Sequence, residues 1–216
     1  MPKEKKMEII GAFSRALKPV CPKLYVAAPD VNTGEEEMAV FAKENGSMRA
    51  CTGKPANMCV EPGVKWGIPH EHGSKGFGVD QATLTVAEHV DLDIKDAKAA
   101  IEGFGNVGSY AAEYLAQIGV KVVAVSDSKG CIYNPEGLEY EKLSKVKMET
   151  QSVINYKPGK VMDNREIFEL SVDILIPAAL SDVITEDNVS RVKAKMVVEA
   201  ANIPVRPEIE EVLRKK

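Results

Sequence analysis

The feature of this sequence that most constrains its fold is a glycine-rich stretch at residues 99–108, Ala-Ala-Ile-Glu-Gly-Phe-Gly-Asn-Val-Gly. Its first three residues end a short apolar run of strand type, and the glycines that follow have the spacing that lets a chain turn from a strand into a helix. We expect Gly103 to allow the tight turn and Gly105 to leave the backbone open on one side. Gly108 should let a helix that begins near Val107 pack against the strand.

The same stretch predicts a site for the two phosphates of a dinucleotide, because a helix N-terminus offers free N–H groups and a positive dipole end. A second strand over residues 121–126 ends just before Asp127, close to the ~20-residue offset of the acid that binds the adenosine ribose. The alternative is a structural turn in which Asp127 is an N-capping residue. The predicted cofactor site contains Gly103, Phe104, Gly105, Asn106, Val107, Gly108, Asp127, Ser128 and Lys129.

Composition argues against several classes of partner. The 216 residues are 44% hydrophobic, enough for one core and a small second lobe. The formal net charge is −4 and no basic stripe carries interleaved aromatic residues, so we expect no nucleic-acid partner. No apolar run is long enough for a bilayer, and the first residues lack an apolar signal core, so we expect a cytoplasmic protein. Free thiols, without a disulfide or a metal site, are expected at Cys21, Cys51, Cys59 and Cys131.

The N-terminal part predicts a helix, a short strand and a loop that carries a candidate carboxylate. Apolar residues at helical spacing predict a helix to about Lys18, and residues 23–26 have strand character. Thr33 and Glu36 form a capping box, which predicts a second helix. Asp30 thus lies between a strand end and a helix start, where a carboxylate is either a functional group or a turn former.

Residues 46–78 are rich in glycine and proline and predict a long irregular loop. A loop of this length in a compact domain is usually functional. His70 and His72 lie in it, and solvated side chains are the favoured interpretation over metal ligands. A helix over residues 80–90 should follow. Its inward residues are predicted to be Ala82, Val86 and Val90.

Strands and helices alternate from residue 98 onward, with turns between them. The sequence predicts turns at 128–130 and 134–137, a helix around 140–148, an irregular stretch at 151–164, a short helix at 165–170, a strand at 172–177, a helix at 185–192 capped by Thr185, a strand at 196–200 and a final helix opened by Pro207.

This alternation is typical of an α/β protein and predicts a Rossmann-type doubly wound parallel sheet with helices on both faces. We expect this domain to span residues 79–216, after a small N-terminal helical and loop appendage at residues 1–78. Ligands of such sheets bind beyond the carboxyl ends of the strands. The cofactor site should therefore also contain Ala178, Ala179 and Asn202, which follow two of the predicted strands.

Six stretches of the sequence, taken together and in order, resemble glutamate dehydrogenases. They are Ala28-Pro-Asp-Val-Asn-Thr-Gly-Glu-Glu-Glu-Met, Thr52-Gly-Lys-Pro, Gly103-Phe-Gly-Asn-Val-Gly-Ser, Val125-Ser-Asp-Ser-Lys-Gly, Ile174-Leu-Ile-Pro-Ala-Ala-Leu and Val198-Glu-Ala-Ala-Asn. The resemblance implies oxidation of an amino acid to the imine by hydride transfer to NAD or NADP, followed by hydrolysis to a keto acid and ammonia. It makes Asp30 the catalytic residue that passes protons at the α-amino group, and it places Asn202 near the nicotinamide ring.

The sequence departs from that family at particular positions. The family's glycine-rich lysine motif, which supplies a catalytic cation, does not precede Asp30 here. Lys75 stands where the family has a threonine, Ile203 where it has a glycine, and Glu102 where it has a glutamine beside the pyrophosphate turn. A carboxylate at this last position would repel phosphates unless its side chain points away from the turn.

Three functions are compatible with these features. The chain is an NAD(P)-dependent amino acid dehydrogenase, a non-catalytic dinucleotide-binding domain, or half of a split enzyme whose partner chain supplies the lysine domain. The charge of Asp127 predicts that NAD is preferred, with NADP tolerated because Lys129 softens the repulsion of a 2′-phosphate. Because the family's hexamer is assembled mainly through the domain not found here, we expect a monomer or a small homo-oligomer.

Overall fold

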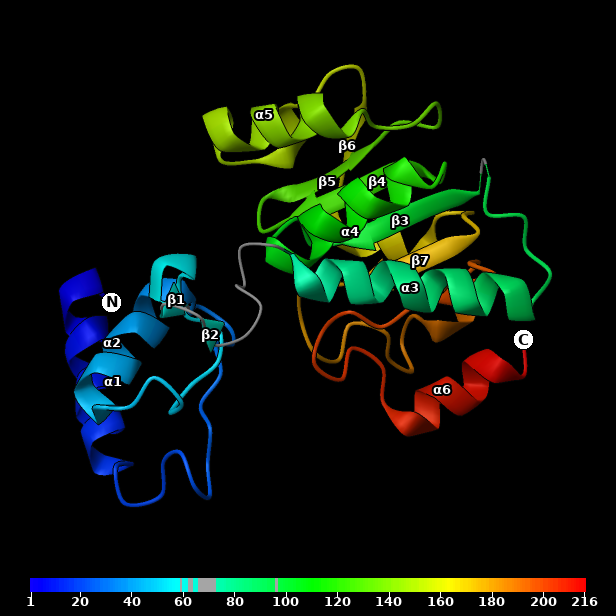
Figure 1. Ribbon diagram of the computed structural model, residues 1–216. Helices are drawn as coiled ribbons and strands as arrows, with labels where there is room; N and C mark the ends of the chain where they lie inside the picture. Colours follow the sequence, from blue (N-terminus) through cyan, green and yellow to red (C-terminus); the bar gives the residue numbers. More distant parts are fainter. Residues whose placement is uncertain (59, 62–63, 66–72, 96) are drawn as a thin grey trace. The chain divides into compact units, whose positions relative to one another are not determined.

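The computed structural model describes residues 1–58, 60–61, 64–65, 73–95 and 97–216. They form two compact units, Met1–Ser74 and Lys75–Lys216, and each unit is described by itself (Figure 1). His70, His72 and Cys59 lie outside the described residues. In the described part of the chain, no helix combines the length and the apolar composition needed to cross a bilayer.

The first unit is built on two helices, α1 (Lys3–Ala16) and α2 (Glu35–Asn45), followed by η1 (Ala56–Met58) and a small hairpin of β1 (Val60–Glu61) and β2 (Val64–Lys65). A buried hydrogen bond of 2.6 Å from the Ser14 hydroxyl to the Phe41 carbonyl joins the two helices. Burial of the apolar face of α2 supplies the core of this unit, which contains Cys21, Ala27, Met38, Phe41, Ala42, Ala50 and Cys51.

Three predictions for this unit are wrong in detail. Residues 17–24 form turns rather than a strand at 23–26, and the chain makes only an isolated parallel bridge between Ala27 and Cys51. The capping box is displaced by one residue, because Gly34 is the N-cap and its amide donates to Glu37 Oε2 at 2.7 Å. The loop predicted at 46–78 contains η1 and the β1–β2 hairpin, and it ends earlier, where α3 begins.

The second unit is built on a six-stranded sheet with the order β6-β5-β4-β3-β7-β8. Its strands are β3 (Lys98–Glu102), β4 (Lys121–Asp127), β5 (Gly130–Tyr133), β6 (Lys160–Met162), β7 (Ile174–Pro177) and β8 (Met196–Val197). The four strands β4, β3, β7 and β8 are parallel, which puts their carboxyl ends at one edge of the sheet. β5 and β6 pair antiparallel with their neighbours.

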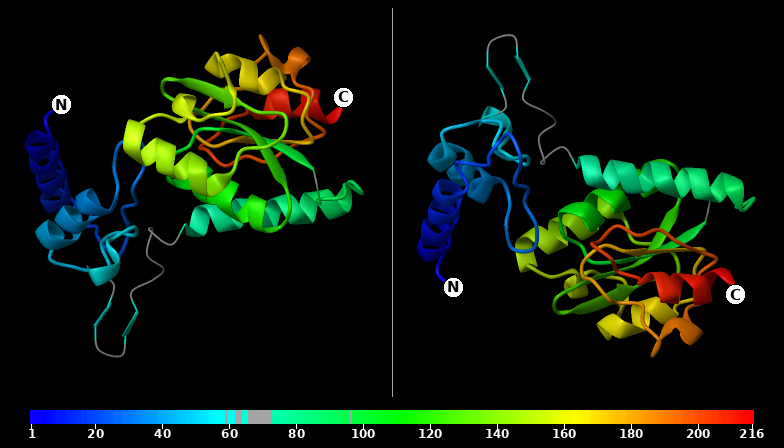
Figure 2. Two further views of the ribbon diagram at one scale, coloured as in Figure 1. Left: turned by 90° about the horizontal axis from the view of Figure 1, so that it is seen from above. Right: turned by 90° about the horizontal axis from the view of Figure 1, so that it is seen from below.

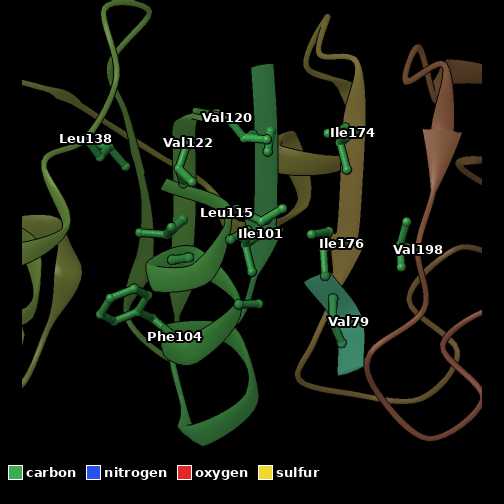
Figure 3. Close-up of a cluster of buried hydrophobic side chains, with 14 of the residues drawn as sticks. Val79, Ile101, Phe104, Leu115, Val120, Val122, Leu138, Ile174, Ile176 and Val198 are labelled. Atoms are coloured by element: carbon green, nitrogen blue, oxygen red, sulfur yellow. The ribbon is translucent and has the colours of Figure 1, made fainter. Parts of the chain in front are cut away.

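Helices cover both faces of this sheet, as Figure 2 shows for α3 (Ser74–His89) and α4 (Asn106–Gln117) on one side and α6 (Pro207–Arg214) on the other. The strand period of two divides the apolar residues between these faces. Ile101 and Ile176 pack with Val79 of α3 and Leu115 of α4 (Figure 3). Ala100 instead belongs to the opposite cluster, beneath α6 and the 3₁₀ helix η4 (Asn164–Glu169).

The α/β class is confirmed, and the elements around the glycine-rich stretch and the helix opened by Pro207 lie where the sequence predicts them. The two antiparallel strands were not predicted, because β5 follows a turn of only two residues and β6 lies in the stretch expected to be irregular. The predicted helix at 185–192 is a turn followed by η5 (Val189–Arg191). The predicted face of α3 is right only for Val86, which is partly buried against the core, whereas Ala82 and Val90 are exposed. The buried residues of α3 are Gly76, Val79, Asp80, Thr83 and Ala87.

The remaining helix of this unit, α5 (Tyr140–Thr150), matches the helix predicted around 140–148. It ends at Gln151, which has a left-handed φ of 60°, and the chain continues directly into η3 (Val153–Asn155). The C-terminal end of α5 and the start of η3 both contact the end of β4, where Asp127 lies.

Candidate nucleotide-binding site

The turn between β3 and α4 requires glycine at its first position. Gly103 has a φ of 96°, which L side chains rarely adopt. A Cβ there would also lie 2.8 Å from the Cβ of Ala179. The Gly103 amide donates to the hydroxyl of Ser126 at 3.1 Å, so the turn is tied to the end of β4.

The other two glycines of the turn have opposite surroundings. Gly105 is the N-cap of α4, and a Cβ on it would meet no atom within 4 Å. A Cβ on Gly108 would lie 2.0 Å from the carbonyl oxygen of Gly103. Thus Gly108 allows the close packing of α4 on the turn, whereas Gly105 leaves a patch of bare backbone beside the first amides of the helix, including those of Asn106 and Val107. The N-cap residue, a glycine, supplies no side-chain hydrogen bond to these amides.

Asp127 lies beside this turn, at the carboxyl end of β4, and its carboxylate is surrounded by four donors from its own chain. Oδ2 accepts from Lys147 Nζ at 2.7 Å and from the Val153 amide at 2.8 Å. Oδ1 accepts from the Lys129 amide at 2.9 Å and from the Ser152 hydroxyl at 3.2 Å. Burial alone would raise the pKa of this carboxyl, but the ammonium of Lys147 and the two amides outweigh burial and hold it below its ordinary value.

Lys147 and Ser152 were not predicted as part of this site. The sequence places Lys147 on a helix, but the partner of a lysine depends on how the helix returns to the sheet, which the pattern of apolar residues does not reveal. By contrast, Ser128 and the side chain of Lys129 are exposed next to Asp127, as expected for residues that follow the end of a strand.

The loops after β7 and β8 complete this edge of the sheet. Ala178 and Ala179 follow β7 directly, and a Cβ on Gly103 would contact both of them. Asn202 is exposed in the loop after β8, where its carbonyl accepts from the Ser181 hydroxyl at 2.6 Å. The structure thus brings the glycine turn, Asp127 and the loop at 178–181 together at the carboxyl ends of the strands, with Asn202 joined to that loop.

The candidate catalytic residue Asp30 lies in the other unit, on an exposed turn. Its amide donates to the Thr33 hydroxyl at 2.7 Å, and that hydroxyl donates back to the Asp30 carbonyl at 2.9 Å. Gly53, which has a φ of 65°, packs against Pro29, the residue directly before Asp30. A Cβ on Gly53 would lie 2.5 Å from Pro29 Cγ. The two sequence stretches around Asp30 and Gly53 therefore form one local structure, while Asp30 is not placed relative to the residues of the second unit.

A family model described as Glutamate/Leucine/Phenylalanine/Valine dehydrogenase matches residues 67–216. The chain belongs to this dehydrogenase family.

Curated relatives and solved structures agree with this assignment. A glutamate dehydrogenase of Aeropyrum pernix is 43% identical over 88% of this chain and 46% of its own length. An NADP(+)-dependent glutamate dehydrogenase of Pyrobaculum calidifontis is 37% identical over 93% of this chain and 49% of its own length. An NAD-specific glutamate dehydrogenase of Staphylococcus aureus is 36% identical over 91% of this chain and 47% of its own length. The structure of a hetero-hexameric glutamate dehydrogenase from Thermus thermophilus matches with a TM-score of 0.84 and 25% identity, over all of this chain and 51% of that one. The chain therefore spans about half the length of the relatives that it matches.

The local structure accounts for one departure from the glutamate dehydrogenase pattern and shows strain at another. Glu102 is only 8% exposed and points to the loop after β7, where its Oε2 accepts from the Ala179 amide at 3.0 Å. Burial raises the pKa of this carboxyl, although the amides of residues 178–180 partly oppose the effect. Ile203 has a φ of 49°, a conformation that favours glycine, so the residue that replaces the family's glycine is strained.

A separate groove of about 1010 Å³ lies along β8, next to the ends of α3 and α6. Val90, Met196 and Leu213 are among its lining residues, and none of the predicted site residues is.

Within the described residues, no group of three or more His, Cys, Asp or Glu side chains is arranged to hold a metal ion.

Proposed function

We propose that the unit Lys75–Lys216 binds a nicotinamide dinucleotide with its diphosphate at the N-terminus of α4. The observation that carries this proposal is the glycine turn, in which Gly105 exposes bare backbone beside the uncapped start of a helix. Anions bind readily at such a helix end, because free amides and the helix dipole act together. In this proposal the turn at residues 103–108, from Gly103 through Phe104 to Gly108, surrounds the diphosphate, and Ala178, Ala179 and Asn202 line the nicotinamide end. Because the Gly103 amide donates to Ser126, the amides that bind the phosphates are those at the start of α4.

The proposed reaction is the oxidative deamination of an L-amino acid, with glutamate as the first substrate to test. When bound, the nicotinamide accepts a hydride from the α-carbon, and water then converts the imine to a 2-oxo acid and ammonia. Asp30 is the proposed residue that accepts and returns the proton at the α-amino nitrogen. Two observations support this assignment: the curated relatives are named glutamate dehydrogenases, and the packing of Gly53 on Pro29 fixes the turn that carries Asp30.

Cofactor binding and turnover are separable in this proposal. We propose that these 216 residues bind the cofactor, and that efficient turnover needs the catalytic cation of the family's lysine motif, which does not occur before Asp30 in this sequence. Losing such a cation costs several kcal/mol of transition-state stabilisation and hence orders of magnitude in rate. The competing function is a dinucleotide-binding domain without catalysis.

A cofactor titration and a glutamate assay on the same sample test both parts. We expect NAD to bind below millimolar concentration, with NADP tolerated, and turnover to be far below ordinary enzyme rates. Failure to bind either cofactor at millimolar concentration would disprove the proposal. Asp30→Asn should leave binding unchanged and remove any residual turnover, whereas Glu36→Gln, which changes another exposed acid of this unit, should alter neither.

We also propose that the protein is cytoplasmic and forms a monomer or a small homo-oligomer. The free thiols of the buried residues Cys21 and Cys131 support a reducing compartment. Size-exclusion chromatography with light scattering measures the assembly, and a hexamer of this chain would contradict the second part.

A further inference from the structure

The surroundings of Asp127 assign a specific task to Lys147. A carboxylate offers about four lone-pair positions, and the four donors around Asp127 occupy them. The Asp127 side chain is 5% exposed. The two hydroxyls of an adenosine ribose would therefore have to displace donors that the chain itself supplies, so the expected role of Asp127 as ribose acceptor does not fit this arrangement.

The charge of Asp127 is also offset. Lys147 Nζ lies 2.7 Å from Oδ2, and its side chain is 29% exposed, so one end of the ion pair faces solvent while the carboxylate does not. An ammonium carries three N–H groups, and the structure gives one of them to Asp127. The solvent side of this pair therefore presents a cation, next to the exposed residues Ser128 and Lys129.

We propose that Lys147 determines the tolerance of this site for the 2′-phosphate of NADP, by neutralising Asp127 and offering its remaining N–H groups to the phosphate. The inference rests on the proposed function, because it concerns the adenosine end of the same cofactor. The sequence prediction attributed the tolerance for NADP to Lys129, which softens the repulsion between Asp127 and the 2′-phosphate. The structure assigns this role to Lys147 instead.

Lys147 has a second, purely structural role that an experiment must separate from the first. The ion pair holds the C-terminal end of α5 against β4, so removing it changes stability whether or not a cofactor binds there. A stability change alone is therefore uninformative. The ratio of the affinities for NADP and NAD is informative, because the two cofactors differ only in the 2′-phosphate.

The test measures dissociation constants of NAD and NADP for the full chain by titration calorimetry. For the original protein we expect both cofactors to bind, within about tenfold of each other. Lys147→Met should weaken NADP at least about tenfold, as expected for the loss of one charge-assisted contact, and should change NAD less than about threefold. Lys147→Arg keeps the charge and should keep NADP binding. Lys145→Met removes the same charge from an exposed position of α5 and should change neither constant.

The double variant Asp127→Asn/Lys147→Met separates the two parts of the mechanism. It should bind NADP more tightly than Lys147→Met does, because no acid charge is left to repel the phosphate, but less tightly than the original protein. An unchanged NADP-to-NAD ratio in Lys147→Met would overturn the inference, and so would binding of NAD but not NADP by the original protein, while both results leave the proposed function standing. Binding of neither cofactor would overturn both.

Discussion

The close approach of α4 to the glycine turn in the second unit yields a sharp prediction for Gly108→Ala. The added Cβ would lie 2.0 Å from the Gly103 carbonyl oxygen and 2.9 Å from its carbonyl carbon. Carbon–oxygen contacts in proteins are normally about 3.3–3.6 Å, so α4 or the turn must move by about 1.3 Å. Neither partner is a flexible side chain, because the oxygen belongs to a turn already fixed by the bond between Gly103 and Ser126.

The expected magnitude follows from two opposing effects. Overpacking a core costs typically about 1–3 kcal/mol, and contact with backbone puts this substitution near 3 kcal/mol. Alanine gains up to about 1 kcal/mol over glycine from helix propensity. The net loss of about 2 kcal/mol should lower the melting temperature by about 4–8 °C for a chain of this size.

Gly105→Ala is the matched control, because the same methyl group meets no atom within 4 Å. It should change stability by less than about 1 kcal/mol, but it places a methyl group on the backbone where we propose the diphosphate lies. Thermal unfolding and cofactor titration of both variants test the reasoning. A Gly108→Ala protein with unchanged melting temperature would refute the packing argument, and full cofactor affinity in Gly105→Ala would refute the placement of the diphosphate.

Three further predictions concern pH, backbone strain and thiol reactivity. The pKa of Asp127 is lowered in the folded state, so its charge stabilises the protein at pH values above 3.8, the ordinary pKa of this carboxyl. This stabilisation is lost as the pH falls through the lower pKa of the folded state. Asp127→Asn should therefore cost about 1.5–3 kcal/mol at pH 7 and progressively less below pH 3.8, as measured by urea unfolding. Burial instead raises the pKa of Asp80, whose Oδ1 has no hydrogen-bond partner among the described residues, so Asp80→Asn should stabilise the protein at neutral pH by about 1 kcal/mol and have little effect at pH 3. The same sign for both variants at pH 7 would contradict the argument. Ile203→Gly should raise the free energy of unfolding by about 1 kcal/mol, because the strain at φ 49° is relieved and the side chain is 64% exposed; a loss of stability would contradict it. Burial raises the pKa of Cys131 to about 12 from 9.0, so its alkylation at pH 8 should be at least about 1,000-fold slower in the folded than in the unfolded chain, and comparable rates measured by mass spectrometry would count against this.

The glycine turn shows what a sequence can reveal about a site. The conformations of Gly103, Gly105 and Gly108 follow from local requirements: a positive φ, an open backbone and a close approach. Each requirement concerns residues adjacent in the chain or one strand away, so the residue type alone carries the information. The same holds for Pro207, whose missing N–H costs nothing at the first position of α6.

Elements set by distant contacts were predicted less well. The inward face of α3 was assigned from Ala82, Val86 and Val90, but the buried face instead includes the polar residues Asp80 and Thr83. Thr83 meets its hydrogen-bonding need inside the helix, by donating to the Val79 carbonyl at 2.8 Å. A polar residue satisfied in this way occupies an interior position without leaving an apolar signal, so hydrophobic periodicity places Val86 correctly against the core but misplaces Ala82 and Val90.

Asp127 illustrates why the chemistry of a site is harder to predict than its position. The offset from the glycines places this acid correctly at the end of β4, because strand lengths and a single crossover fix that distance. Its hydrogen bonds depend on Lys147, which lies on α5, and on Ser152 and Val153, which follow the sharp turn at Gln151. The sequence therefore predicts the position of this acid, whereas in our proposal the preference between NAD and NADP depends on the residues of the same chain that already bind it.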